Sequence, residues 1–293
     1  MEARLQRRVQ RYGWDLAAAD YETLWQSQLA RAHAELLTCA SLARGERVLD
    51  VACGTGLVRF DAARAVGKAG RVVGVDLSDR MLDAARHRAQ SERTSNVDFA
   101  RMDAESLALP DASFDVTLCA LGLMYLPDPA RAVREMRRVL RPGGRIVIAV
   151  WGERSRCGWS ELFSIIDAEV AGDVCPMFFC LGQEDTLVRL CADTGLEAMT
   201  QRRVGSVLNY ADANEACNAA FLGGPVALAW SRFDAQVRAR IRTRYLQAIE
   251  GYRDKENDSE ESYGIPGEFV IVAARCSESG SESAPRWAMG VTA

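Results

Sequence analysis

Two spacings of apolar residues alternate along the first half of the chain. Short runs rich in β-branched residues predict five strands, at 47–52, 71–76, 97–103, 114–121 and 145–151. Apolar residues at helical spacing predict helices before and between these strands, at 21–43, 61–67, 78–91 and 129–140. Because strands and helices alternate, we expect βαβ units in an α/β fold, a mostly parallel sheet with helices on both faces, and ligands at the carboxyl ends of the strands.

The pattern changes after Trp151. Helical spacing recurs at 157–170, 183–195, 211–221 and 230–250, a short strand is predicted at 196–205, a polar loop at 252–262, and a last, antiparallel strand at 267–275. We therefore expect N-terminal cap helices over 1–45, a core over 46–275 with a helical cap inserted at about 152–255, and a tail over 276–293 of disordered composition.

Composition limits the classes of function. The chain has 293 residues, 48% of them hydrophobic, and a net charge of −4, which gives no reason to expect a nucleic-acid partner. The charged N-terminus is unlike a signal peptide, and no segment approaches the ~18–20 apolar residues that span a bilayer. With two histidines and no CxxC pair, no metal site is expected. We expect a cytoplasmic protein without a transmembrane segment; a homodimer is left open.

The loop after the first strand, in "VLDVACGTGL" (48–57), predicts a ligand site. Gly54 and Gly56 let the backbone approach a ligand, and Asp50 at the strand end is expected to be a fixed anion nearby. A dinucleotide fingerprint would need a third glycine where this chain has Arg59, and no Gly-Lys-Ser/Thr follows for a nucleoside triphosphate. The residues therefore favour a ligand without phosphates.

Two further acids end the next strands. Asp76 could accept both hydroxyls of a ribose, and Asp103 could accept from an exocyclic amine. Alternatively, Asp76 could cap the helix that begins near Ser78, and Asp103 could be a turn residue. An adenosine that carries a cation and no phosphate meets all these demands, and S-adenosylmethionine is such a molecule.

Four segments together resemble a known family. "VLDVACGTG", "VVGVDLS…ML", "ARMDAESLALPDASFDV" and "RPGGRIVIAVW" look like the successive motifs of class I S-adenosylmethionine-dependent methyltransferases, within them the small-molecule branch of ubiquinone/menaquinone-type enzymes. The resemblance covers residues 46–151 and weakens after Trp151. It implies a Rossmann-like sheet of seven strands whose last strand is antiparallel.

The resemblance also implies roles for single residues. Ala52 and Gly54 would contact the methionine part and the ribose through the backbone, and Asp76 would hold the ribose hydroxyls. Leu77 would lie against the adenine, whose amino group Asp103 would bind.

Two more positions carry over. The Ala104 amide would meet a ring nitrogen of the adenine, and the Cys119 carbonyl would contact the methionine moiety. One position departs from the family, which usually has glycine where this chain has Ala52. Since alanine demands ordinary φ and ψ, we expect a small loop adjustment with binding retained.

Aromatic and apolar residues outside these motifs predict an acceptor site. Tyr21 and Trp25 are assigned to the cofactor. The acceptor side is expected to comprise Tyr12, Trp14, Met124, Tyr125, Trp151 and Phe178. An apolar or amphipathic small molecule would suit such a site, although each of these residues could instead pack the cap against the sheet.

Methyl transfer is an in-line displacement that positioning and a dry pocket can accelerate without a strong acid or base. Catalytic residues are therefore not assigned. We expect methyl transfer to carbon, oxygen, nitrogen or sulfur of a small molecule. The alternatives are an RNA or protein methyltransferase and a donor-binding regulator without turnover.

Overall fold

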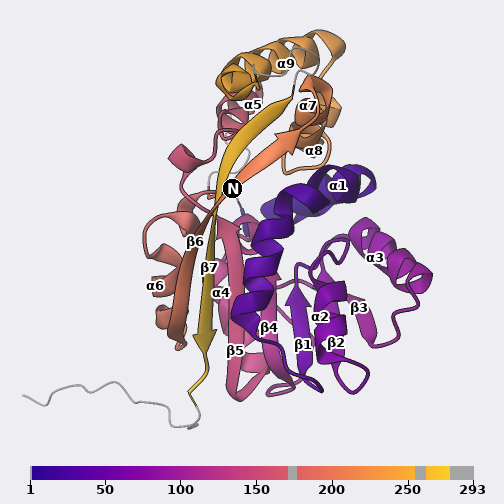
Figure 1. Ribbon diagram of the computed structural model, residues 1–293, viewed down its shortest axis with the longest axis vertical. Helices are drawn as coiled ribbons and strands as arrows, with labels where there is room; N and C mark the ends of the chain where they lie inside the picture. The colour runs from indigo at the N-terminus through magenta and orange to yellow at the C-terminus, as the bar shows by residue number, and fades with distance from the viewer. Residues whose placement is uncertain (1, 171–176, 255–261, 278–293) are drawn as a thin grey trace, which may run out of the picture.

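Seven strands form one mixed sheet in the computed structural model, which describes residues 2–170, 177–254 and 262–277. The strand order is β3-β2-β1-β4-β5-β7-β6 (Figure 1). The strands are β1 (Arg47–Val51), β2 (Arg71–Asp76), β3 (Val97–Arg101), β4 (Phe114–Ala120), β5 (Leu140–Trp151), β6 (Glu197–Tyr210) and β7 (Tyr263–Arg275). β1 to β5 pair in parallel, and β7 runs antiparallel to both β5 and β6. The predicted sheet and its antiparallel last strand are confirmed.

Three helices connect the parallel strands: α2 (Arg59–Val66), α3 (Asp79–Ser91) and α4 (Pro129–Val139). Side-chain caps set where two of them begin. The Ser78 hydroxyl accepts from the Met81 amide at 3.1 Å, and the Asp128 carboxylate accepts from the Arg131 amide at 2.9 Å. Pro129 occupies the first turn of α4, where a missing N–H removes no helical hydrogen bond. The crossovers therefore leave the loops after β1 to β4 at one edge of the sheet.

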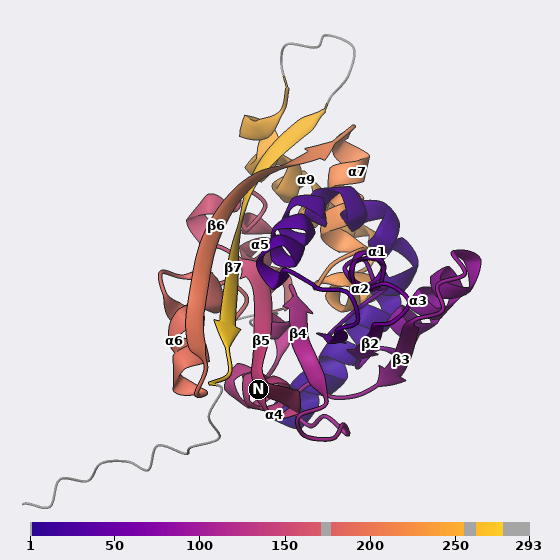
Figure 2. The same cartoon turned by 60° about the horizontal axis from the view of Figure 1, so that its bottom comes forward.

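A single helix, α1 (Ala3–Ala40), replaces the expected group of N-terminal cap helices. It ends at Ser41, whose φ of 45° lies in the left-handed region. The buried residues Leu29, Ala32 and Leu36 pack its C-terminal half against the sheet. Its N-terminal half lies across the carboxyl ends of the first strands, beside α3 and α8 (Figures 1 and 2).

The second half of the chain adds the cap helices α5 (Glu161–Val170), α7 (Ala213–Phe221), α8 (Ala227–Arg232) and α9 (Ala235–Ile249). A further helix, α6 (Thr186–Asp193), packs against β6 and beside α4, away from the cap (Figure 1). The helix predicted over 230–250 is in fact α8 and α9, because Asp234 caps a new helix by accepting from the Val237 amide at 2.8 Å. β6 and β7 extend past the core of the sheet and carry the cap helices (Figure 2).

Several boundaries differ from the predicted ones. β6 and β7 are longer than predicted because their outer ends pair with each other. β5 begins at Leu140, so the "RPGG" turn lies within the strand. Most of the predicted polar loop and the tail from residue 278 lie outside the described residues. Among the helices that the structure describes, none is both long and apolar enough to cross a membrane.

Candidate functional site

A pocket opens where the loops after β1, β2, β3 and β4 meet the N-terminal half of α1. The space at this place, including the open solvent at its mouth, is about 820 Å³. Nine residues predicted for the site line it: Trp14, Tyr21, Ala52, Gly54, Asp76, Leu77, Asp103, Ala104 and Tyr125. The structure thus brings the predicted cofactor loops together at the carboxyl edge of the sheet.

The loop after β1 keeps a left-handed conformation at Ala52. Its φ is 55°, close to the 53° of Gly54, so the expectation of ordinary φ and ψ was wrong. An L-residue in this region costs about 1–2 kcal/mol, which the surrounding contacts must offset. Gly122 makes the space, since a Cβ there would overlap the Ala52 methyl group. Leu121, beside it, is also left-handed, with a φ of 60°.

The Asp76 carboxylate is fixed by backbone donors around the pocket. Its two oxygens accept from the Gly54 amide at 2.8 Å and from the Ser78 amide at 2.9 Å. Burial raises the pKa of Asp76, and the amides of Ser78, Gly54 and Leu77 counteract this rise. Because the Ser78 hydroxyl caps α3, the carboxylate is not needed as the helix cap. Three amides leave the carboxylate at least one of its about four acceptor positions for a ligand.

Asp103 forms an ion pair with a residue of α1 that the sequence did not predict. Arg7 Nε lies 2.9 Å from one carboxylate oxygen of Asp103, and the same guanidinium pairs with Glu105. The other oxygen of Asp103 accepts from the Glu105 amide at 2.9 Å. Arg7 therefore stands where the resemblance places an adenine amino group.

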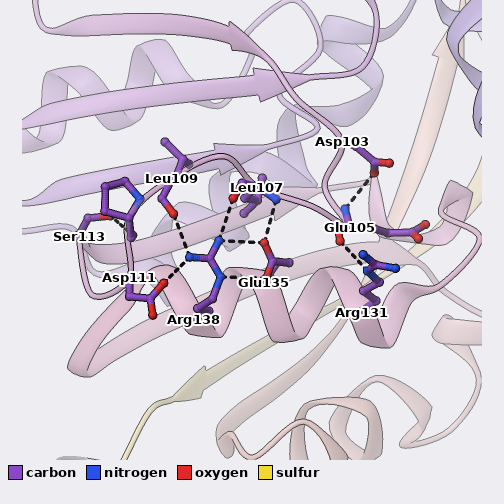
Figure 3. A network of polar contacts seen from close by, with 10 residues as sticks. Asp103, Glu105, Leu107, Leu109, Asp111, Ser113, Arg131, Glu135 and Arg138 are labelled. Carbon is purple, nitrogen blue, oxygen red and sulfur yellow. Dashed lines mark hydrogen bonds and ion pairs between the residues drawn. The ribbon is translucent and has the colours of Figure 1, made fainter.

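The segment after β3 is fastened to α4 by a network of polar contacts (Figure 3). Arg131 Nε donates to the Glu105 carbonyl at 2.8 Å, and Arg138 donates to the carbonyls of Leu107 and Leu109 at 2.8 and 2.9 Å. Glu135 accepts hydrogen bonds from Arg138 and from the Leu107 amide. The bond from Arg138 lowers the pKa of the Glu135 carboxyl. The network holds the loop that carries Asp103 against α4.

α1 forms the roof of the pocket. Trp14 makes edge-to-face contacts with Tyr21 and Tyr125, at ring-centroid distances of 5.8 and 5.1 Å. Burial, and secondarily the charge of Asp76, raises the pKa of Tyr21, so its hydroxyl stays protonated. Sequence reasoning missed the other lining residues of this helix, Arg7, Gln10 and Arg11. Gln10 and Arg11 lie four and three residues before Trp14, and Arg7 lies four residues before Arg11, so helical spacing was the available signal.

Other lining residues were also not predicted as site residues. They come from the strand ends and the loops beside them: Val75, Ser78, Met81, Met102, Ala120, Leu121, Gly122, Leu126 and Pro127. The pocket reaches Ala120 and Leu121 rather than Cys119, which is fully buried within β4. β4 ends at Ala120, one residue before the predicted end.

Asp50 lies behind the pocket rather than in it. Burial raises the pKa of its carboxyl to about 7, although Arg59 lowers it, so near neutral pH the group is only partly ionised rather than the fixed anion that was expected. Arg59 is itself fully buried, with its guanidinium carbon 3.3 Å from the Phe99 ring centroid. It packs beside Gly74 of β2, which explains how an arginine fits where a dinucleotide-binding loop has glycine.

The remaining predicted site residues do not line the pocket. The Tyr12 side chain is exposed on the outer face of α1, and Gly56 turns the loop away from the pocket beside Phe60. The others are buried in the apolar core: Trp25, Met124, Trp151 and Phe178. The rings of Trp25 and Trp151 pack on each other, with their centroids 6.2 Å apart. For these residues the structure favours the alternative, that they pack the cap against the sheet.

The lining residues limit the chemistry. Among the described residues that line the pocket, the carboxyl groups are those of Asp76 and Asp103, and no histidine, cysteine or lysine is present. Both carboxylates already accept backbone hydrogen bonds. The pocket therefore suits binding and orienting better than proton abstraction.

Comparison with known proteins agrees with this geometry. Residues 49–148 match a family model described as "Methyltransferase domain". The demethylmenaquinone methyltransferase of Lactococcus lactis is 40% identical over 103 residues, which is 35% of this chain and 41% of the relative. The ubiquinone/menaquinone biosynthesis C-methyltransferase UbiE of Cronobacter sakazakii is 38% identical over 113 residues, 38% of this chain and 45% of the relative.

A solved structure extends the likeness beyond the matched segment. The [4+2]-cyclase SpnF is 23% identical, has a TM-score of 0.58, and covers 89% of this chain and 85% of its own. This likeness shows the fold alone, and the sequence matches span less than half of the curated relatives. Within residues 49–148, however, the family model, the motifs and the strand order agree, and this part of the chain is similar to a methyltransferase domain.

Proposed function

We propose that the protein transfers a methyl group from S-adenosylmethionine to a small, apolar or amphipathic acceptor. The observation that carries the proposal is the pocket itself, which joins two carboxylates, Asp76 and Asp103, to a wall of apolar and aromatic residues. A cationic donor with ribose hydroxyls suits the first part, and an apolar acceptor suits the second.

The donor would lie along the loops. Asp76 would accept from the ribose hydroxyls with the lone pairs that Gly54 and Ser78 leave free. The adenine would rest against Leu77 near Asp103 and the Ala104 amide. The methionine part would lie by Ala52 and under Tyr21. The Tyr21 ring lies 4.0 Å from the position that a Cβ atom would take on Gly54. These placements follow from the lining residues and the resemblance.

The acceptor would lie beside Trp14, Tyr125 and Leu126. The curated relatives are named for demethylmenaquinone and for C-methylation in quinone biosynthesis. We infer that an electron-rich ring carbon is the accepting atom, since a reduced, ionised quinol is nucleophilic without help from the protein. A C–C bond forms as the S–CH₃ bond breaks, its electron pair stays on sulfur, and the ring proton leaves to water.

The pocket does not favour a macromolecular acceptor, because α1 roofs it with Arg7, Trp14 and Tyr21. Action without nucleic acid, a cytoplasmic location and a homodimer stay predictions. So do the proposed domain boundaries.

Turnover with methyl-labelled S-adenosylmethionine tests the proposal. Reduced naphthoquinols, catechols, fatty acids, amines, thiols and RNA would be offered separately as acceptors. We expect labelled product with a reduced ring, and loss of that product in Asp76→Asn. Label in RNA or protein alone would overturn the small-molecule assignment. Donor binding without turnover on any acceptor would favour a regulator.

A further inference from the structure

The outer face of the N-terminal half of α1 carries apolar side chains. Leu5, Tyr12 and Leu16 are 49%, 42% and 49% exposed. Their spacing of seven and four residues places them in one stripe along the helix. Val9, half-buried, lies in the same stripe. A stripe of this kind normally faces a partner, and here the described residues leave about half of each of these three side chains uncovered.

Basic side chains border this stripe. Residues 2–14 contain four arginines, Arg4, Arg7, Arg8 and Arg11, against one acid, Glu2, in a chain of net charge −4. Arg7 points inward to Asp103 and Glu105, whereas Arg4 and Arg8 are exposed and form no ion pair with the described acidic residues. Arg8 also lies 5.7 Å from the centroid of the Tyr12 ring. Apolar and cationic groups therefore share one face.

The stripe continues onto α8. Leu228 and Arg232 line a groove together with Tyr12 and Leu16, and Phe233 lines a second groove together with Val9. Two acids, Asp15 and Asp83, also border the first groove. Asp15 accepts from the Ser78 hydroxyl at 2.6 Å, so it is turned toward α3. The face as a whole stays apolar at its centre and basic at its end.

The opposite face of the same helix is the roof of the pocket. Arg7, Arg11 and Trp14 line the pocket, while Leu5, Tyr12 and Leu16 point away from it. Whatever binds the outer face is therefore one helix diameter from the site.

We propose that this face of α1 docks on the surface of a bilayer that contains anionic lipids. Leu5, Tyr12 and Leu16 would enter the interface, and Arg4 and Arg8 would meet the anionic head groups. A second copy of the chain suits the face less well, because its own arginines would oppose these. Docking brings the pocket to the place where amphipathic molecules dissolve. The proposal goes beyond methyl transfer and does not depend on turnover.

Sedimentation of the full chain with vesicles tests this proposal. We expect at least tenfold tighter binding to phosphatidylcholine vesicles with phosphatidylglycerol than to pure phosphatidylcholine, and weaker binding as salt rises. Leu5→Glu with Leu16→Glu should remove at least nine-tenths of the binding. Arg4→Gln with Arg8→Gln should remove the preference for the anionic lipid.

A matched pair of substitutions controls for general effects of charge. Met199→Glu with Val207→Glu places the same charges at residues of β6 that are 52% and 54% exposed, and should leave vesicle binding within a factor of two. Unfolding midpoints and S-adenosylmethionine affinity should be unchanged in all three double variants. Absent or lipid-independent binding by the wild type would overturn the proposal, as would equal loss in the β6 variant. So would a wild-type dimer that Leu5→Glu with Leu16→Glu converts to a monomer.

Discussion

The residues predicted for the site have different surroundings in the loops after β1 to β4 and in the cap above β5 to β7. In the loops, Asp76 and Asp103 face the pocket. In the cap, Trp151, Trp159 and Phe178 face one another, with centroids 4.8 Å apart for the first pair and 5.6 Å for the last two. The difference teaches that position in the fold decides which residues meet a ligand. The carboxylates that end β2 and follow β3 line the pocket, whereas Asp50 of β1 lies behind it and the aromatic residues of the cap pack on other apolar surface.

Truncating Phe178 tests whether the aromatic residues of the cap belong to the core. Its side chain is 1% exposed and contacts Tyr125, Trp159 and Phe163. If it is core, Phe178→Ala should lower the free energy of unfolding by about 3–5 kcal/mol in denaturant titration. Met177→Ala, next to it and 48% exposed, is the control and should change that energy by less than about 0.5 kcal/mol. A stable Phe178→Ala protein with a raised KM for the acceptor would mean that the cap does meet substrate.

Asp50, which lies behind the pocket, should affect the pH dependence of stability. Its pKa is about 7 when folded, above the ordinary 3.8, mainly through burial. The folded state therefore holds a proton that the unfolded state has lost, and stability falls as pH rises toward 8. Asp50→Asn removes this dependence. We expect the free energy of unfolding of Asp50→Asn, relative to that of the wild type, to rise by about 2 kcal/mol between pH 5 and pH 8.

Urea titrations of both proteins at the two pH values measure this gain. Asp115→Asn serves as the control, since Asp115 pairs with Arg141 near the surface at the opposite edge of the sheet. A difference between wild type and Asp50→Asn that does not change with pH would show that Asp50 is ionised throughout.

Substituting Arg7 should have the smallest effect, because this residue joins α1 to the loop that carries Asp103. Its ion pair with Asp103 is partly exposed, so it is worth at most about 1 kcal/mol. Arg7→Gln should therefore speed both association and dissociation of S-adenosylmethionine by a factor of about two to five in stopped-flow fluorescence. Arg4→Gln, on the exposed outer side of the helix, should leave both rates unchanged. Unchanged rates in Arg7→Gln would show that α1 does not control entry.

Local signals sufficed for the sheet and for much of the site. Alternating apolar runs gave the strands, and Ser78 was recognisable as a helix cap because its hydroxyl precedes a helical pattern. Asp76 followed from its place at a strand end. These residues act within a few positions of their own element, so sequence spacing carries the information.

The rest depended on contacts between distant segments. Arg7 reaches Asp103 and Glu105 from almost a hundred residues away, and no local pattern foretells that ion pair. Gly122, far along the chain from Ala52, leaves room for the Ala52 methyl group, and no local pattern shows that contact. The extra length of β6 and β7 likewise arises from their pairing with each other.

Calorimetry of S-adenosylmethionine binding tests the central claim most directly. Removing Asp76 takes away charge-assisted hydrogen bonds worth about 1.5–3 kcal/mol each, so Asp76→Ala should weaken binding at least about a hundredfold. Asp115→Ala, at the opposite edge of the sheet, should bind like the wild type. Equal affinities of Asp76→Ala and wild type, or no binding by the wild type, would contradict the assignment of this pocket to the methyl donor.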